Sequence, residues 1–208
     1  MAIKTDMSKE YDRMEWSFIE AVMCKMGCSE IWITWIMCCI TSVKYKVLMN
    51  GEPTGNIVPG RGLRQGDPLS PFIFIVCTEA LVSLLSHAES QGKITGMRVT
   101  RAGPSVFHLL FADDNLFFCK AVPRECEEVM KVVRKYGKAS GQCINFDKSS
   151  LLFGKRINAT IRQEIKDAIG IQSEGGMRTY LGIPEDISGS KCKLFAFLKD
   201  KLMHRVNG

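Results

Sequence analysis

The sequence lacks several features that would assign it to a special class of protein. No two cysteines have C-x-x-C spacing, so the nine cysteines form no recognisable zinc or disulfide framework. The longest strongly apolar run covers residues 31–40, about half of the ~20 residues that a membrane span requires. The start of the chain has no signal-peptide pattern, and repeats and low-complexity segments are absent. We therefore predict an intracellular protein, nuclear or cytoplasmic, with reduced, buried thiols and no membrane partner.

Composition and charge point to an ordinary folded domain with a modest basic excess. The chain has 208 residues, of which 46% are hydrophobic and 24% charged, enough for one sizeable core. Of the net charge of +6, the segment from residue 154 onward carries +4, from ten basic and six acidic residues, and the first 153 residues carry +2. This balance fits a polyanionic partner, and it fits a solvated surface equally well.

Hydrophobic periodicity predicts an α+β fold. Ser29 and Ser70 are expected to cap helices, Pro71 to lie in a first helical turn, and Asn50-Gly51 to turn a hairpin. Each remaining boundary follows from apolar spacing or from a turn signal. The predicted strands cover residues 2–6, 43–49, 55–58, 94–99, 106–111, 116–119, 150–153 and 180–183, and the predicted helices cover 15–27, 70–92, 123–138 and 157–169, with two more starting at 29 and 190.

Two adjacent aspartates, Asp113 and Asp114, separate two apolar runs in a pattern that predicts a hairpin. Their like charges repel, so a cation should compensate them, and Mg²⁺ is a hard ion that prefers carboxylate oxygens. Two such ions can activate an attacking hydroxyl and stabilise a leaving pyrophosphate. Asp6, at the end of another predicted strand, would complete the site. Alternatively, Asp-Asp is ordinary turn chemistry and Asp6 an ordinary strand-end residue.

Five segments favour the metal-site interpretation over ordinary turn chemistry, because they occur together and in a fixed order. They resemble the successive palm motifs of reverse transcriptases from plant-type non-LTR (LINE) retrotransposons. The resemblance covers nearly the whole chain. The segments are Asp6 to Trp16 (DMSKEYDRMEW), Arg61 to Pro71 (RGLRQGDPLSP), Phe111 to Asp114 (FADD), Gly141 to Ser149 (GQCINFDKS) and Tyr180 to Pro184 (YLGIP).

This resemblance implies a fold and a function. The fold would be a polymerase palm, an antiparallel sheet backed by helices, truncated so that most of the fingers and thumb are missing. Residues 1–154 would form the palm core, and 155–208 the palm end with a primer-grip-like turn and the start of a thumb or connection. The activity would be that of an RNA-directed DNA polymerase, a nucleotidyltransferase that uses two Mg²⁺ ions, or Mn²⁺, to add dNTPs to a DNA primer on an RNA template.

The resemblance also assigns roles to individual residues. Gly66, together with Gly62, would let the loop backbone approach a nucleotide, and Gln65 would offer it a neutral amide. Lys148 would protonate or stabilise the leaving pyrophosphate, although an isolated lysine is more often solvated surface. The implied metal ligands are Asp6, Asp113 and Asp114, the nucleotide-binding residues are Tyr11, Arg64, Gln65 and Gly66, and the primer-grip residues are Tyr180, Leu181 and Gly182.

One residue departs from the family pattern. Glu10 stands where the family commonly has a small alanine, and a charge beside the nucleotide sugar would obstruct or repel it. Fingers, thumb, endonuclease and Cys/His-rich segments of full-length elements are not recognisable, so we expect this chain alone to be inactive. Two alternatives remain: a catalytically dead palm remnant that at most binds nucleic acid, and, less well matched, a maturase-like intron splicing factor.

Overall fold

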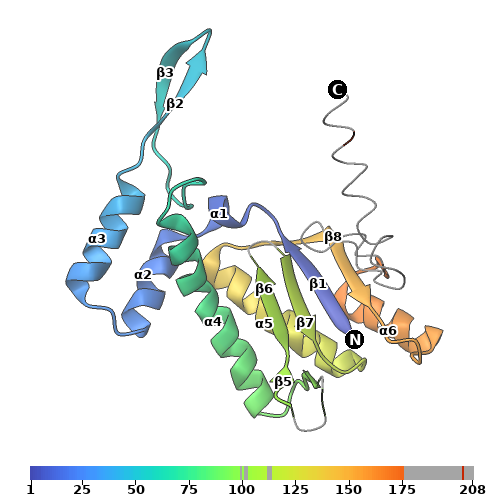
Figure 1. Cartoon of the computed structure of the whole chain (residues 1–208). Helices are drawn as coiled ribbons and strands as arrows, with labels where there is room; N and C mark the ends of the chain where they lie inside the picture. Colours follow the sequence, from blue (N-terminus) through green and yellow to red (C-terminus); the bar gives the residue numbers. More distant parts are fainter. Residues whose placement is uncertain (99, 101–102, 112–113, 176–202, 204–208) are drawn as a thin grey trace.

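The structure is a computed structural model that describes residues 1–98, 100, 103–111, 114–175 and 203 (Figure 1). The predicted strand at 180–183, the predicted helix from residue 190 and Asp113 lie outside the described residues.

A four-stranded antiparallel sheet organises the fold. Its strands are β1 (Ala2–Met7), β6 (His108–Phe111), β7 (Asp114–Phe118) and β8 (Ile144–Leu152), in the spatial order β6-β7-β1-β8. The first strand in sequence therefore lies in the interior of the sheet, between strands that come more than 100 residues later. This is the split arrangement in which helical connections return to one face of the sheet.

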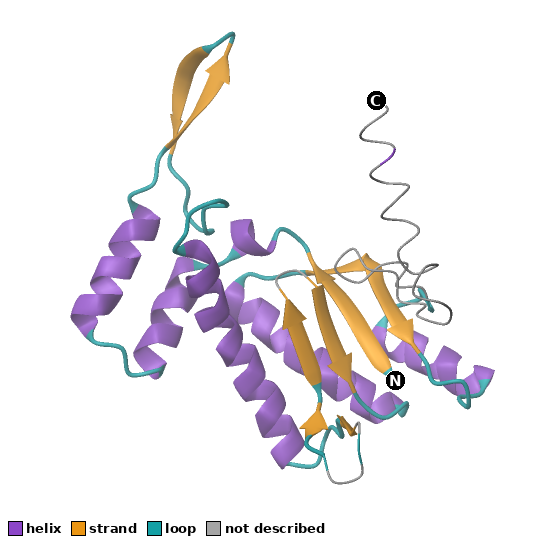
Figure 2. Cartoon of the chain, viewed as in Figure 1, coloured by secondary structure: helices purple, strands orange, loops and turns teal. Residues whose placement is uncertain are grey.

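Three helices pack against this sheet: α4 (Ser70–Ser90), α5 (Pro123–Ser140) and α6 (Ala159–Ile169). Figure 2 shows α5 crossing behind the strands. A first hydrophobic cluster joins Ile3 and Phe117 of the sheet to the three helices and excludes water from both side chains, each 0% exposed. Among the described helices, only α4 is long and apolar enough to cross a membrane by length and composition, and it packs here against α2 and α5.

A second hydrophobic cluster lies beside the sheet. Helices α2 (Trp16–Lys25) and α3 (Glu30–Thr41) pack there against the first turns of α4. The hairpin of β2 (Tyr45–Met49) and β3 (Glu52–Ile57) extends away from the body in Figure 1, and every residue of both strands is exposed. The remaining elements are the short helix α1 (Glu10–Arg13) and the two-residue strands β4 (Met97–Arg98) and β5 (Ser105–Val106).

Most predicted elements are present, and the differences from the prediction are local. Ser70 is the buried first residue of α4 rather than its cap, whereas Ser29 caps α3 as expected by accepting from the Trp32 amide at 3.3 Å. The predicted strand 150–153 is the end of β8, which begins at Ile144 because pairing with β1 extends it. The helix α1 was not predicted, because its four residues are too few to show a periodicity.

The expectation that the cysteines are buried was only partly correct. Cys77, Cys119 and Cys126 are buried, and the eight cysteines of the described part of the chain are all free thiols. Exposed thiols occur on α2, α3 and at the start of the GQCIN segment. The apolar residues of α2 and α3 surround each helix, so one buried face cannot cover them all. The exposed residues are Cys24, Cys38, Cys39 and Cys143.

Two helix-ending glycines differ in one respect that can be tested. Gly141 and Gly170 both have φ +81°, but a Cβ on Gly141 would collide with the Arg13 carbonyl oxygen, whereas one on Gly170 would only touch Phe146 at 3.9 Å. Gly170→Ala should cost about 1–2 kcal/mol for the left-handed conformation alone. Gly141→Ala should cost about 1–3 kcal/mol more, because it also forces α5 away from the Arg13 segment. Urea unfolding of both variants measures this difference, and equal losses would contradict the close approach.

Candidate active site

Asp6 and Asp114 are brought face to face by the pairing of β1 with β7. The register aligns Ile3 with Phe117 and Asp6 with Asp114. Because side chains alternate along a strand, burying Ile3 and Thr5 on the helix side turns Lys4 and Asp6 toward the other face. Directly opposed residues lie about 4.5–5.5 Å apart at Cβ. The two carboxylates predicted to act together are therefore neighbours on one face of the sheet.

A lysine that the sequence analysis did not identify lies within this carboxylate site. Lys4 precedes Asp6 by two residues on the same face, and its Nζ lies 2.9 Å from Asp114 Oδ1. The two side chains are only 15% and 21% exposed. Like-charged carboxylates placed opposite each other need a positive charge nearby. Alternation of Lys4 with Asp6 in a predicted strand is the signal that could have revealed it.

An irregularity in β8 lies next to Asp6. The register pairs Lys4 with Ser150 and Asp6 with Asn145, so residues 146–149 bulge opposite Thr5. Inside the bulge, the Ser149 hydroxyl donates to Asn145 O at 2.6 Å and accepts from the Asp6 amide at 3.3 Å. Lys148 is an exposed residue of the same bulge. The fourth motif thus fixes the backbone of the first carboxylate.

The helix α1 carries Tyr11 and is held by contacts from distant parts of the chain. The buried Gln142 donates its Nε2 to Glu10 O at 2.5 Å, and the Tyr11 ring stacks on Phe74 at 5.1 Å between centroids. Burial, and then the nearby Glu10 carboxylate, raises the pKa of Tyr11, so its hydroxyl stays neutral at physiological pH. Glu10 thus affects the electrostatic environment of Tyr11.

The loop before α4 is attached to α1 and to the segment that follows it. The Gly62 amide donates to Met14 O and the Leu63 amide to Tyr11 O, each at 2.8 Å, and Trp16 Nε1 donates to Gly62 O at 2.8 Å. A Cβ on Gly62 would lie 2.8 Å from the Asp12 carbonyl oxygen, so this glycine is required by protein packing. Gly66 has φ +84° with open space around it. Its surroundings leave room for a ligand to approach the backbone.

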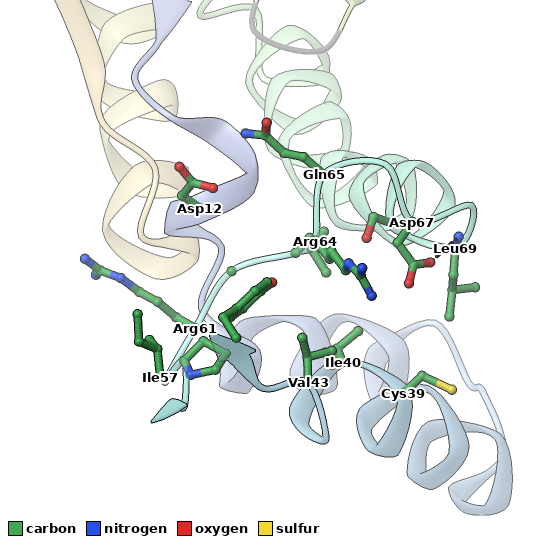
Figure 3. Close-up of a pocket in the computed structure, with 15 residues that line it drawn as sticks. Asp12, Cys39, Ile40, Val43, Ile57, Arg61, Arg64, Gln65, Asp67 and Leu69 are labelled. Atoms are coloured by element: carbon green, nitrogen blue, oxygen red, sulfur yellow. Dashed lines mark hydrogen bonds between the residues drawn. The ribbon is translucent and has the colours of Figure 1, made fainter. Parts of the chain in front are cut away.

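A cavity of about 520 Å³ opens beside this loop, between α3 and the base of the β2–β3 hairpin (Figure 3). Arg64 points into it from the loop, near Asp67, whereas Gln65 points the other way, toward α1. Asp67 Oδ1 also accepts from the Leu69 amide at 2.8 Å and so supports the start of α4. The lining of the cavity therefore combines charged side chains, among them Arg64 and Asp67, with apolar ones. The apolar lining includes Ile40, Val43, Tyr45, Ile57 and Pro59.

The structure brings some predicted site residues together and leaves others undescribed. Asp6 and Asp114 meet across β1 and β7, and Tyr11 connects through α1 to the loop of Arg64, Gln65 and Gly66. Within the described residues, no cluster of three or more His, Cys, Asp or Glu side chains is positioned to hold a metal. Asp113 and the predicted primer-grip residues Tyr180, Leu181 and Gly182 lie outside the described part of the chain. Ser149, Gln142 and Trp16 are supporting residues that no sequence signal assigned.

The antiparallel sheet backed by helices is a palm-like fold, and comparisons with known proteins agree. Residues 1–184 match the family model described as reverse transcriptase (RNA-dependent DNA polymerase). The chain belongs to this family. Two solved structures of telomerase from Candida tropicalis are similar in fold, each 16% identical in sequence. One, in complex with a fragment of telomeric RNA, matches 96% of this chain with a TM-score of 0.60, and the other, an apo form, matches 76% with a TM-score of 0.55.

The curated relatives are mobile-element proteins and one plant protein. An uncharacterized mitochondrial protein of Arabidopsis thaliana is 55% identical over 67 residues, 32% of this chain. The Pol polyprotein of the R2 element of Popillia japonica is 23% identical over 90% of the chain, and the TX1 149 kDa protein of Xenopus laevis 25% identical over 71%. The chain spans 55%, 31% and 11% of these relatives, in the same order.

These findings confirm the predicted family and fold. The resemblance to non-LTR reverse transcriptases and the palm-like antiparallel sheet backed by helices are confirmed, and the matched family is that of RNA-dependent DNA polymerases. Enzymes of this family use divalent metal ions and bind an RNA template and a primer.

The bulge in β8 gives a test of how Asp6 is held. Ser149→Ala removes both hydrogen bonds of a fully buried hydroxyl, so we expect a loss of about 1–3 kcal/mol in unfolding free energy. Amide hydrogen exchange at Asp6 should become faster. The neighbouring half-buried Ser150 provides the control, since Ser150→Ala should change stability by at most about 0.5 kcal/mol. Unchanged exchange at Asp6 in the Ser149 variant would argue against a role for the bulge.

Proposed function

We propose that this chain supplies the catalytic palm of an RNA-directed DNA polymerase from a non-LTR retrotransposon. The observation that carries the proposal is the register of β1 and β7, which sets Asp6 opposite Asp114 at the hairpin of the FADD motif. In this proposal, residues 1–154 form the palm core, and residues 155–208 complete the palm and lead toward a thumb or connection. The substrates are dNTPs, an RNA template and a DNA primer.

The carboxylates are the proposed ligands of two Mg²⁺ ions, or of Mn²⁺. Oxygen donors suit these hard cations, and the accumulation of negative charge around Asp6, Asp113 and Asp114 favours a divalent ion. When bound, the ions would activate the primer hydroxyl and neutralise charge on the phosphates. The protein's own contribution is to hold the carboxylates in place. The Ser149 hydroxyl fixes the backbone at Asp6, and the strand pairing fixes Asp114.

The nucleotide would lie between α1 and the loop of the second motif. The flat, neutral Tyr11 side chain, supported by Phe74, would lie under the deoxyribose and disfavour a 2′-hydroxyl. Gln65 points toward α1, and the open positive-φ Gly66 lets the backbone approach a ligand. Arg64, which points into the cavity rather than toward α1, would have to turn toward the nucleotide to pair with its phosphates.

Two further roles complete the proposal. Lys148, exposed in the bulge next to the strand that carries Asp6, would stabilise or protonate the leaving pyrophosphate. Tyr180, Leu181 and Gly182 would support the primer end.

Primer extension tests the proposal. Because the chain spans 31% of the R2 relative, we would assay an R2-type Pol polypeptide that carries residues 1–184 in place of its own matching segment. Extension on an RNA template with Mg²⁺ should fall at least about 100-fold on Asp113→Ala. That change removes a proposed ligand of the metal ions that stabilise charge in the transition state. Asp147→Ala, at an exposed acidic residue of β8, is the control. If Asp113→Ala extends as well as the parent, the polymerase assignment is wrong. If the parent chimera folds and binds primer and template but does not extend the primer, the chain is an inert remnant.

Sugar selection gives an independent test of Tyr11. In the same chimera, Tyr11→Ala should raise the relative use of rNTPs by about 10- to 200-fold, the range expected when a small steric contact of about 1–3 kcal/mol is lost. Phe74→Leu removes the stacking partner but keeps the tyrosine, and should shift selectivity much less. Comparing kcat/KM for dNTP and rNTP measures the effect. Equal selectivity in wild type and Tyr11→Ala would show that Tyr11 does not select the sugar of the nucleotide.

A further inference from the structure

Among the ion pairs of the described residues, Lys4–Asp114 combines strong shielding with a position inside the carboxylate site. The Arg61–Glu15 pair is 53% and 37% exposed, and the Lys131 side chain is 72% exposed, as expected for surface pairs of small energetic value. Lys4 and Asp114 are 15% and 21% exposed, so water screens their charges less. The pair therefore influences the electrostatics of the site more than a surface pair would.

The strand geometry explains how Lys4 reaches Asp114. Lys4 is opposite Leu116 in the register, and Asp114 is the diagonal neighbour two residues away on the same face. Diagonal neighbours lie about 7–8 Å apart, within reach of a long side chain. The ammonium is thus directed along the sheet toward the end where Asp6 and Asp114 face each other, with Nζ 2.9 Å from Asp114 Oδ1.

We propose that Lys4 is the internal counter-cation of the carboxylate site, and that divalent cations bind Asp114 in competition with its ammonium. This inference rests on the proposed function, because it concerns the same carboxylates. An oxygen that already contacts an ammonium offers less electron density to a metal ion, and the lysine charge repels a second cation nearby. Lys4 therefore holds the carboxylates together in the metal-free protein and lowers their affinity for divalent ions.

The competing explanation is that Lys4 serves only as a structural anchor for Asp114. An anchor keeps a ligand in position, so its loss would weaken metal binding. A counter-cation occupies the ligand, so its loss would strengthen metal binding. The two roles predict opposite signs for the same measurement.

The chain contains a matched control for the charge removal. Lys166 Nζ lies 2.8 Å from Glu174 Oε2, with side chains 16% and 28% exposed, which closely resembles the Lys4 pair in length and shielding. Lys166 belongs to α6, and Glu174 is bridged to the end of β8, so this pair does not involve Asp6 or Asp114. Lys166→Met therefore removes an ion pair of similar length and shielding and leaves Asp6 and Asp114 unchanged, while Glu174 keeps Arg162 as a second cationic partner.

The experiment is a titration of this chain with Mn²⁺ followed by electron paramagnetic resonance, without nucleotide or nucleic acid. Lys4→Met and Lys4→Gln should bind Mn²⁺ at least about 10-fold more tightly than wild type, because each removes the competing charge. Lys4→Arg, which keeps the charge, and Lys166→Met should stay within about 3-fold of wild type. Two Lys4 variants are used so that a folding defect in one, seen by circular dichroism, leaves the other to decide.

Thermal melting supplies a second readout. Without metal, Lys4→Met should melt below wild type because the carboxylates lose their counter-charge, and saturating Mn²⁺ should largely close this gap, since the metal replaces the missing charge. Any change in melting temperature caused by Lys166→Met should be the same with and without Mn²⁺, because this pair lies outside the carboxylate site. Weaker or unchanged Mn²⁺ affinity in both Lys4 variants would overturn the counter-cation role.

Asp6→Asn and Asp114→Asn separate this inference from the function on which it rests. If wild type binds Mn²⁺ and both Asn variants lose the binding, the metal site stands, and the Lys4 variants alone decide the inference. If both Asn variants bind Mn²⁺ as wild type does, the carboxylates are not the metal ligands, and the proposed function fails together with the inference.

Discussion

The antiparallel pairing of β1 with β7 is the constraint on which the site depends. It sets two carboxylates, Asp6 and Asp114, directly opposite each other, an arrangement that by itself destabilises a sheet. The opposite face of the same strands compensates, because Ile3 and Phe117 are completely buried against the helices. A slip of one residue would exchange the two faces, burying charge and exposing the core. Hydrophobic burial on one face therefore fixes the charged residues on the other.

The short helix α1 shows how the remaining motifs depend on this arrangement. A helix of four residues cannot be stable by itself, since nucleation is unfavourable and few hydrogen bonds repay it. It is held instead by the buried Gln142 amide, by the Leu63 amide and by the stacking of Tyr11 on Phe74. Gln142 and Leu63 belong to two different motifs, and Phe74 belongs to α4. Residues that sequence comparison groups as separate signatures are thus parts of one support for Tyr11.

The sequence predicted the elements and the family well, and the local geometry of the site less well. Alternation and turn residues located the strand of Asp6 and the hairpin of Asp114, although Asp114 was expected in the turn and is the first residue of β7. Motif order linked the two residues. The β8 bulge and the Lys4–Asp114 ion pair depend on which strands become neighbours. Ser70 illustrates the same limit: its local pattern predicts a cap, but packing buries it as the first residue of α4. Partners distant in sequence decide such details.

The long apolar helix α4 has a physical reason to be both long and apolar. Its first turns contribute Ile73, Phe74 and Cys77 to the cluster beneath α2 and α3, and its later turns contribute Leu81 and Leu85 to the cluster beneath the sheet. At 1.5 Å per residue, its 21 residues span roughly 30 Å, enough to cross both clusters. The nucleotide loop is attached before α4, and the carboxylates lie on the sheet. A continuous helix that is apolar along both clusters is what keeps these two parts of the site at a fixed separation.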